Sequence, residues 1–407
     1  MIIFFRRFFA LKGKKLKKLK FAIEKILLML YNSNVLKKSS RELTRHGGER
    51  KCTMKEFKRI GVLTSGGDAP GMNAAIRAVV RTALSHGVEV VGIYRGYSGL
   101  IDGDIKLLEL RDVSNIINKG GTILYSDRCP EFKTPEGMAK AVKTCHDFGI
   151  DGIVAIGGDG TFRGATDLTA HGVPCIGIPG TIDNDITSTE NTIGFDTAMN
   201  TVVDLVDKLR DTCESHARCN VVEVMGRGAG DIAISTGIAS GATAIVVPEF
   251  HYSDDAIIKQ INDARHQGKR NFIIIVSEGV GSDYAPALAD KIERETGVET
   301  KFARLAHVVR GGNPTLKDRV LACTMGAIAV EELLKGNSNL VMCDKLGKIV
   351  PVDIRYALIL DRMYKGKLKD GDLDGFSEEE LASMRADIKR KQYALARLYG
   401  ISKTINL

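Results

Sequence analysis

Short apolar runs alternate with amphipathic stretches along most of the chain. The runs are rich in valine and isoleucine and are bounded by glycine and polar residues, which predicts buried β-strands. The predicted strands are 60–64, 89–94, 152–156, 175–178, 221–225, 243–247, 272–277 and 305–309.

Helical periodicity fills the segments between these runs. Apolar residues recur at three- and four-residue spacing from Phe195 to Leu209, which predicts one buried helix face. A second helix is predicted over 72–86. Ser377 and the glutamates after it predict the capped start of a charged surface helix over 377–399. Strands and helices that alternate in this way predict an α/β fold with parallel sheets and crossover helices.

Composition narrows the class of protein. The chain has 407 residues, enough for two domains, and many of its 43 glycines directly follow the apolar runs. In α/β proteins, ligand sites lie at such strand ends. The eight cysteines show neither a C-x-x-C pair nor zinc-like spacing, so we expect reduced thiols and a cytoplasmic protein.

Charge is distributed unevenly. The net charge of +8 arises in residues 1–53, which carry 15 basic and 3 acidic residues, whereas the remainder is mildly acidic. We therefore expect no nucleic-acid partner. The apolar runs of this segment are too short to span a bilayer, and no secretory cleavage pattern follows them. We expect no stable membrane association.

Two interpretations of residues 1–53 stay open. The segment is a basic amphipathic helix that lies on a membrane surface, or it is disordered leader translated from a misassigned start. Met54 opens a natural N-terminus just before the first predicted strand, and Gly48-Glu49 can be encoded by a purine-rich ribosome-binding sequence. An intact mass that includes residues 1–53, measured on protein from the native host, would exclude the second interpretation.

Two glycine-rich loops suggest phosphate and metal binding. Residues 65–73 read SGGDAPGMN between a strand and a helix, where backbone N–H groups can approach a phosphate. This loop is neither a Walker loop nor G-x-G-x-x-G, and a tight structural turn is the alternative. Residues 156–161 read IGGDGT, whose acid can reach a magnesium ion. Several kinase families share that motif, and a plain strand–helix turn is again the alternative.

A third loop carries two carboxylates. Residues 179–185 read PGTIDND, and we expect Asp183 and Asp185 to lie on an exposed turn. Two acids so close are costly unless a cation or a proton transfer uses them. Phosphoryl transfer to a hydroxyl needs a proton acceptor and neutralisation of charge. The three loops together favour a kinase.

Six segments of the chain form a family pattern. In order, they are GVLTSGGDAPGMNAAIR, IGGDGT, PGTIDNDI, TIGFDTA, VVEVMGR and HVVRGG. From about residue 60 to 362 the chain therefore resembles the bacterial ATP-dependent 6-phosphofructokinases. The resemblance implies transfer of the γ-phosphate of MgATP to the 1-hydroxyl of fructose 6-phosphate, the committed step of glycolysis. It also implies an allosteric homotetramer and two Rossmann-like three-layer domains, with the active site in the cleft between them.

The same resemblance assigns roles to individual residues. Asp183 matches the catalytic base, Asp185 supports it and the metal, and Thr181 holds the transferred group. Arg227 stabilises the migrating phosphoryl, and Gly67 offers its backbone N–H. The implied sugar-phosphate residues are Arg218, Met225, Gly226, Arg227, Glu278, Lys301, His307 and Arg310. The implied nucleotide residues are Gly67, Tyr97, Arg128, Cys129, Gly158, Asp159, Gly160, Thr161 and Gly164, with Asp159 as the Mg²⁺ ligand.

The resemblance also implies domains and subunit contacts. The larger, nucleotide-binding domain is expected to comprise 54–194 and 308–357, and the smaller, sugar-phosphate domain 195–307 and 358–376. Residues 377–407 would form a C-terminal helical tail. Arg218 and Lys301 would reach into a neighbouring subunit, which implies a homotetramer with shared sites. His307 taken alone would more often be a packed histidine.

Several positions bear on the phosphate donor and on regulation. Gly160 and Gly180 stand where pyrophosphate-using relatives typically have an aspartate and a lysine, so they favour ATP. Lys301 stands where the family usually has arginine, which predicts weaker fructose 6-phosphate binding by about 1 kcal/mol. The implied effector residues are Arg77, Arg81, Arg210 and Lys269. The expected arginine, glutamate and lysine are replaced by Leu110, Thr243 and Gln267, which predicts a blunted response to ADP or phosphoenolpyruvate.

The alternatives differ in how much of the pattern they need. A pyrophosphate-dependent phosphofructokinase would share most of it. A lipid or NAD kinase with a GGDG loop would not need PGTIDND or HVVRGG. A catalytically silent sensor would have no use for its intact acidic residues. A Rossmann dehydrogenase is excluded because no G-x-G-x-x-G follows a strand.

Overall fold

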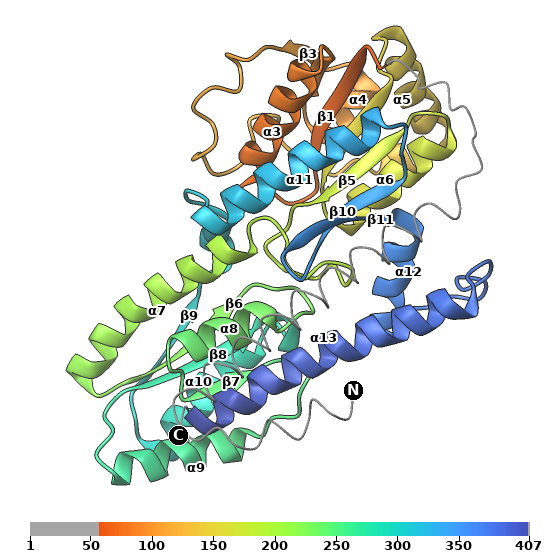
Figure 1. Ribbon diagram of the computed structural model, residues 1–407. Helices are drawn as coiled ribbons and strands as arrows, with labels where there is room; N and C mark the ends of the chain where they lie inside the picture. The colour runs from red at the N-terminus through yellow and green to blue at the C-terminus, as the bar shows by residue number, and fades with distance from the viewer. Residues whose placement is uncertain (1–56, 406–407) are drawn as a thin grey trace, which may run out of the picture. The chain divides into compact units, whose positions relative to one another are not determined.

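The computed structural model describes residues 57–405 (Figure 1). The interpretations of residues 1–53 fall outside the described residues. Within 57–405, no helix is long and apolar enough to cross a membrane. The seven cysteines of this part of the chain are all free thiols.

The larger of two sheets has seven strands in the order β11-β10-β5-β4-β1-β2-β3. The inner strands are parallel, and the edge strands β3 and β11 are antiparallel to their neighbours. The strands are β1 (Arg59–Ser65), β2 (Glu89–Ile93), β3 (Ile105–Leu108), β4 (Gly152–Gly157), β5 (Cys175–Pro179), β10 (Leu340–Lys345) and β11 (Lys348–Asp353).

Helices cover both faces of this sheet, as β4 illustrates. Val154 and Ile156 belong to the apolar cluster that includes α3 (Met72–Ser85) and α11 (Leu316–Leu334). Ile153 and Ala155 point the other way and join the cluster of four further helices. These are α4 (Gly96–Asp102), α5 (Pro135–Asp147), α6 (Asp159–Ala170) and α12 (Ile354–Tyr364). Burial on both faces explains why the strands are continuously apolar.

The smaller sheet repeats this plan with four parallel strands in the order β7-β8-β6-β9. They are β6 (Cys219–Val224), β7 (Ala244–Val246), β8 (Phe272–Ser277) and β9 (Thr300–Arg304). Helices α7 (Phe195–His216) and α8 (Asp231–Ala239) share one apolar cluster with it, and α9 (Asp254–His266) and α10 (Tyr284–Thr296) share another. The predicted α/β fold with two three-layer units is confirmed. The exact division of the chain between two domains stays a prediction.

The charged C-terminal helix is present and begins where its cap predicts. Helix α13 (Glu378–Ile405) starts directly after Ser377, whose backbone N–H donates to Glu380 Oε2 at 2.8 Å. The backbone N–H of Glu380 donates back to Ser377 Oγ at 3.2 Å, which completes a capping box. The helix continues past the predicted end at residue 399 and packs Leu395 and Tyr399 into the core.

One predicted strand is wrong. Residues 305–309 form most of a 3₁₀ helix, η4 (Ala306–Arg310), and the strand of this region is β9 just before it. Ala306 has a φ of 45°, which breaks the extended chain, and Val308 is exposed. The other 3₁₀ helices described are η2 (Glu131–Lys133) and η3 (Glu278–Val280).

Candidate active site

The two glycine-rich loops meet where the order of the larger sheet reverses. Strands β1 and β4 are neighbours, but the chain continues from β1 to β2 on one side and from β4 to β5 on the other. In open α/β sheets, ligands bind outside the carboxyl ends of strands at such a point. Loop 65–73 follows β1, and Gly158–Thr161 follows β4. Thr161 Oγ1 donates to the Ser65 carbonyl at 3.1 Å and joins the two loops.

The turn that carries Asp183 is buried rather than exposed, contrary to the expectation from sequence. Asp183 is 1% exposed, and Asp185 is more accessible. The turn is fixed from inside: the Thr192 hydroxyl donates to the Thr181 carbonyl at 2.6 Å. Asn184 has a φ of 50°, and its side-chain amide donates to Asp231 Oδ1 at 3.2 Å. These bonds hold a conformation that few non-glycine residues adopt.

Asp183 has the environment of a proton acceptor. Its Oδ1 is buried and is the only such side-chain atom without a hydrogen-bond partner in residues 57–405. Its Oδ2 lies 3.2 Å from Nε of Arg227. Burial and the neighbouring Asp185 raise the pKa of Asp183, while Arg310 and Arg227 oppose that rise. A buried acceptor oxygen with nothing to accept is costly, so we infer that a ligand donates to it.

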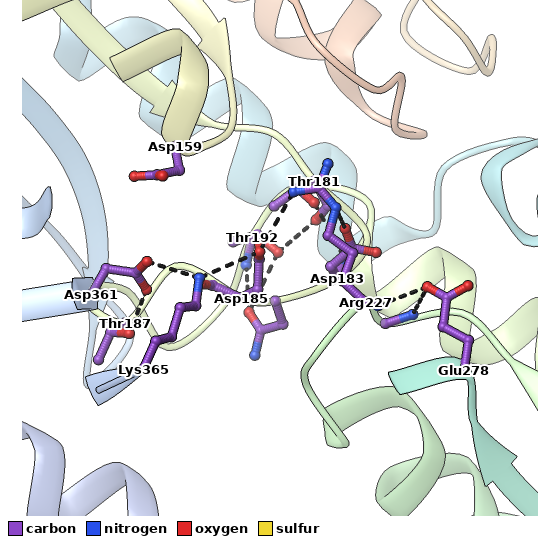
Figure 2. A network of polar contacts seen from close by, with 12 residues as sticks. Asp159, Thr181, Asp183, Asp185, Thr187, Thr192, Arg227, Glu278, Asp361 and Lys365 are labelled. Carbon is purple, nitrogen blue, oxygen red and sulfur yellow. Dashed lines mark hydrogen bonds and ion pairs between the residues drawn. The ribbon is translucent and has the colours of Figure 1, made fainter. Parts of the chain in front are cut away.

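Arg227 connects this turn with the smaller sheet. It follows β6, and its guanidinium reaches both Asp183 and Asp185, the latter at 3.8 Å (Figure 2). Arg227 has a φ of 53°, and hydrogen bonds to its backbone stabilise this conformation. Glu278 Oε1 accepts the backbone N–H of Arg227 at 2.7 Å and that of Gly226 at 3.1 Å. Glu278 therefore fixes the loop that presents the arginine.

Asp159 is the first residue of α6, directly after the N-cap Gly158, and its carboxylate is half-buried. Burial raises its pKa, the charge of Arg163 lowers it, and Asp361 and Asp185 raise it. Arg163 Nη2 forms an ion pair with Asp159 Oδ2. Asp159 and Asp185 therefore influence each other electrostatically, although they come from different loops. The metal and phosphate site at these two loops stays a prediction.

Four of the eight predicted sugar-phosphate residues line one cavity. Met225, Arg227, Glu278 and His307 line one cavity of about 470 Å³ beside the carboxyl ends of β6 and β8. His307 is exposed there, so its interpretation as a packed histidine is wrong. Prediction from sequence missed several lining residues: Glu223, Val224, Ser282, Arg304 and Ala306. Arg304 pairs with Glu223 at 2.7 Å.

Arg218 and Lys301 do not line this cavity. Arg218 precedes β6, and Lys301 pairs with Asn220 near the start of the same strand. Six residues of β6 at roughly 3.3 Å each place them about 20 Å from Met225. Both contact Glu299, at 2.7 Å for Arg218 and 3.0 Å for Lys301, and these contacts lower the pKa of Glu299 to about 2.

Gly67 is exposed and lies beside the end of the Arg310 side chain. A Cβ at this position would come within 2.9 Å of Nη1 of Arg310, which also donates to the Asp68 carbonyl at 3.2 Å. Arg310 thus reaches from η4 to the loop after β1. Arg128 is exposed on a neighbouring loop, which is tied to the first because the Ser126 hydroxyl donates to the Gly66 carbonyl at 2.5 Å.

Tyr97 lies behind the nucleotide loop and not at its surface. It is 4% exposed, stacks on Phe132 and donates its hydroxyl to the Thr161 carbonyl at 2.6 Å. Gly164 permits this contact, because a Cβ there would lie 2.7 Å from the Tyr97 ring. Cys129 is half-buried and packs on the same cluster. These residues support the loop from within, whereas Gly158 and Gly160 face open space.

The implied effector residues are divided between the units of the larger and the smaller sheet. Arg77 and Arg81 are on α3, which covers the larger sheet. Arg210 is on α7 beside the smaller sheet, and Lys269 lies over the Phe272 ring. Burial and the charge of Arg210 lower the pKa of Lys269. Thr243 is buried, and its carbonyl accepts from the Gln260 side chain at 2.9 Å.

Prediction from sequence missed two charged residues beside Asp185. Lys365 Nζ lies 3.6 Å from Asp185 Oδ2 and 2.8 Å from Asp361 Oδ2 (Figure 2). Burial alone would lower the pKa of Lys365, but the carboxylates of Asp185 and Asp361 raise it. Only their spacing of four residues at the end of one helix could have linked these two to each other, and no motif links them to the turn.

Comparison with known proteins shows which family this chain resembles. The model of the family described as phosphofructokinase matches residues 59–333. The ATP-dependent 6-phosphofructokinase of Bacillus velezensis is 56% identical over 298 residues, 73% of this chain and 93% of that protein. The enzyme of that name from Clostridium botulinum strain Hall is 53% identical over 314 residues, 77% of this chain and 98% of that protein.

Solved structures give the same result for the fold. Phosphofructokinase from Saccharomyces cerevisiae matches with a TM-score of 0.73 and 30% identity, over 85% of this chain and 50% of that one. A pyrophosphate-dependent phosphofructokinase from Marinobacter aquaeolei matches with a TM-score of 0.66 at 23% identity, over 73% of this chain and 83% of that one, a likeness of fold alone. Family model, relatives and fold agree, and the chain belongs to the phosphofructokinase family.

Proposed function

We propose that the protein transfers the γ-phosphate of ATP to the 1-hydroxyl of fructose 6-phosphate, which gives fructose 1,6-bisphosphate and ADP. The observation that carries this proposal is the buried, unpartnered Oδ1 of Asp183, next to Arg227 and the cavity of about 470 Å³. The identity to enzymes named ATP-dependent 6-phosphofructokinase supports the same reaction.

The residues of the turn would act on the acceptor hydroxyl. Asp183 accepts the proton of the 1-hydroxyl as its oxygen forms a bond to the γ-phosphorus and the bond to the β-phosphate oxygen breaks. A pKa raised by burial makes this carboxylate a better proton acceptor than an exposed one. Arg227 contacts Asp183 and can neutralise charge on the phosphoryl group in transit.

The donor side fits a nucleotide with magnesium. Mg²⁺ is usually held by one or two carboxylates and by substrate phosphates, not by a cage of protein ligands. Asp159 at the start of α6, with Asp185 near it, matches that donor set, and residues 57–405 hold no larger cluster of metal-binding side chains. When bound, the ion would neutralise charge that develops on the transferred phosphate.

Gly160 supports ATP as the donor. It is exposed, and a Cβ there would meet no protein atom within 4 Å. The space beside Asp159 is therefore available to the α-phosphate and the nucleoside. Gly180 differs, because a Cβ there would lie 3.1 Å from the side chains of Ile156 and Met72. Gly180 is thus a packing position, and its role in donor choice rests on the resemblance alone.

We further propose a homotetramer and a cytoplasmic location. Arg218 and Lys301 lie at the end of β6 away from the cavity. They can serve a sugar-phosphate site only if that site belongs to a neighbouring subunit. The free thiols of the seven described cysteines fit a reducing compartment.

Purified protein supplied with fructose 6-phosphate and one donor at a time tests the reaction. We expect ADP formation with ATP and Mg²⁺, and little turnover with pyrophosphate. The variant Asp183→Asn should lower kcat by about 10²–10⁴-fold, while binding of fructose 6-phosphate changes little. An exposed acid on α7, changed as Asp204→Asn, is the control and should leave kcat as it is. Equal turnover by Asp183→Asn would contradict the proposed base.

A further inference from the structure

Lys365 reaches into the active-site turn from the other end of the chain. It follows α12, and its ammonium nitrogen donates to the backbone carbonyl of Asp185 at 2.9 Å. The same nitrogen lies 3.6 Å from Oδ2 of Asp185 and 2.8 Å from Oδ2 of Asp361. In Figure 2 its side chain lies between the two carboxylates. One cation therefore contacts both the backbone and the side chain of Asp185.

The ammonium is held by a fixed support. Asp361 is buried, and its Oδ1 accepts a hydrogen bond from Thr187 Oγ1 at 2.7 Å. Thr187 belongs to the turn itself, two residues after Asp185. Asp361 therefore connects α12 to the turn through Thr187, and Lys365 connects it through Asp185. Because its partners are fixed, Lys365 loses little freedom when it contacts a ligand.

Two cations share one oxygen of Asp185. Arg227 Nη1 lies 3.8 Å from Oδ2, the oxygen that Lys365 also approaches. Figure 2 shows Arg227 on the side of Glu278 and Lys365 on the side of Asp361 and Asp159. Arg227 thus belongs to the acceptor side and Lys365 to the donor side. The charge of Lys365 also acts on Asp159.

The donor site needs a cation in this position. Triphosphate carries more negative charge than one divalent ion neutralises, and kinases supply lysine or arginine to the phosphates. Asp159, Asp185 and Asp361 add three carboxylates. Lys365 contacts two of these three carboxylates, and Arg163 is paired with the third.

We propose that Lys365 binds the phosphates of the metal–nucleotide complex and positions Asp185. Before the nucleotide binds, its ammonium holds Asp185 in place. When Asp185 turns to the metal, the ammonium is released toward the phosphate oxygens. This inference rests on the function proposed above. The alternative is that these contacts only connect α12 to the turn and take no part in nucleotide binding.

Equilibrium binding separates the two roles. The probes are the magnesium complex of the non-hydrolysable β,γ-imido analogue of ATP and, separately, fructose 6-phosphate, each titrated by calorimetry. Lys365→Met should weaken binding of the nucleotide complex by about tenfold, because one charge-assisted contact is lost. Binding of fructose 6-phosphate should change by less than about twofold. Lys365→Arg keeps the charge and should retain most of the nucleotide affinity.

Lys391 provides a matched control. Its ammonium donates to the carbonyl of Asn184 at 3.1 Å, one residue before Asp185, but its charge acts on Asp231. Lys391→Met should therefore leave the affinity for the nucleotide complex unchanged. If Lys365→Met does not fold, Lys365→Gln gives the same comparison with a side chain that still donates to the Asp185 carbonyl.

Two results would overturn the inference. One is a Lys365→Met protein that is less stable but binds the nucleotide complex like the unaltered chain. The other is an equal loss of affinity in Lys365→Met and Lys365→Arg, since shape and not charge would then matter. Turnover by the unaltered chain separates the two proposals. If that chain forms no ADP with fructose 6-phosphate, the proposed function itself fails. If it is active and Lys365→Met binds normally, only the role of Lys365 fails.

Discussion

At the scale of single residues, the charges around Asp183 decide when it can accept a proton. Burial and Asp185 raise its pKa above the ordinary value of 3.8, and Arg310 and Arg227 act against that rise. A base works only when deprotonated, so kcat/KM should fall as the pH drops through this raised pKa. The resemblance to the family pointed to Asp183 as the proposed base, but the burial that shifts its pKa is a property of the folded turn.

The variant Arg227→Gln tests this balance. Loss of the positive charge leaves the raising effects of burial and Asp185 less opposed, so the pKa of Asp183 rises further. The acid limb of the kcat/KM profile should move to higher pH, by less than about one unit because the Arg227 side chain is 58% exposed and screened by water. The substrates titrate identically in both proteins, so the difference between the profiles reports the enzyme. A shift to lower pH would contradict this electrostatic account.

Gly160 allows a test of donor choice with little effect on folding. Because a Cβ at Gly160 would meet no atom within 4 Å, Gly160→Asp should change the free energy of unfolding by less than about 0.5 kcal/mol. Its carboxylate would repel the α-phosphate, so we expect KM for ATP to rise by about tenfold or more. Gly160→Ser adds a side chain without charge and is the control. An unchanged KM for ATP in both variants would remove Gly160 from the donor site.

At the scale of elements, the apolar runs predicted seven of the eleven described strands and missed β3, β9, β10 and β11, of which only β10 is an inner strand. The residues of β11 are all exposed or half-buried, and they include Pro351, which only an edge position tolerates. The run 305–309 has strand-forming residues, but the left-handed backbone at Ala306 turns it into η4. That turn is what brings His307 to the cavity and Arg310 to Gly67.

Motifs located the site only where its residues are close in sequence. Asp183 and Asp185 share one short loop with Thr181. Lys365 and Asp361 come from a helix far along the chain, and only the packing of α12 against α6 brings them near. Contacts formed between distant segments leave no spacing for a sequence pattern to detect.

Tyr97 allows a test of whether a buried side chain stabilises the nucleotide loop without contacting the nucleotide. Its buried hydroxyl donates to the carbonyl of Thr161 in the first turn of α6. Tyr97→Phe leaves that carbonyl without this donor, so we expect a loss of about 1 kcal/mol in the free energy of unfolding. KM for ATP should change little. Tyr393→Phe, at an exposed tyrosine, is the control. If Tyr97 instead touched the nucleotide, KM would rise and stability would stay the same.

At the scale of the whole molecule, the two ends of β6 assign the sugar-phosphate residues to two places. Met225 and Arg227 follow the strand and line the cavity, whereas Arg218 precedes it. If both groups bind one sugar phosphate, the second group must come from another subunit. Glu299 holds Arg218 and Lys301 side by side, which would present both cations together to that neighbour.

Hybrid oligomers test whether the sites are shared. One parent carries Asp183→Asn and the other carries Arg218→Ala with Lys301→Ala, and each parent alone should be almost inactive. After mixed refolding at equal amounts, about a quarter of the sites would combine an intact turn with an intact pair of cations from the neighbour. Activity should therefore return to about that fraction of the unaltered enzyme. If each site were built within one chain, every site would retain a lesion, and the mixture would stay as inactive as its parents.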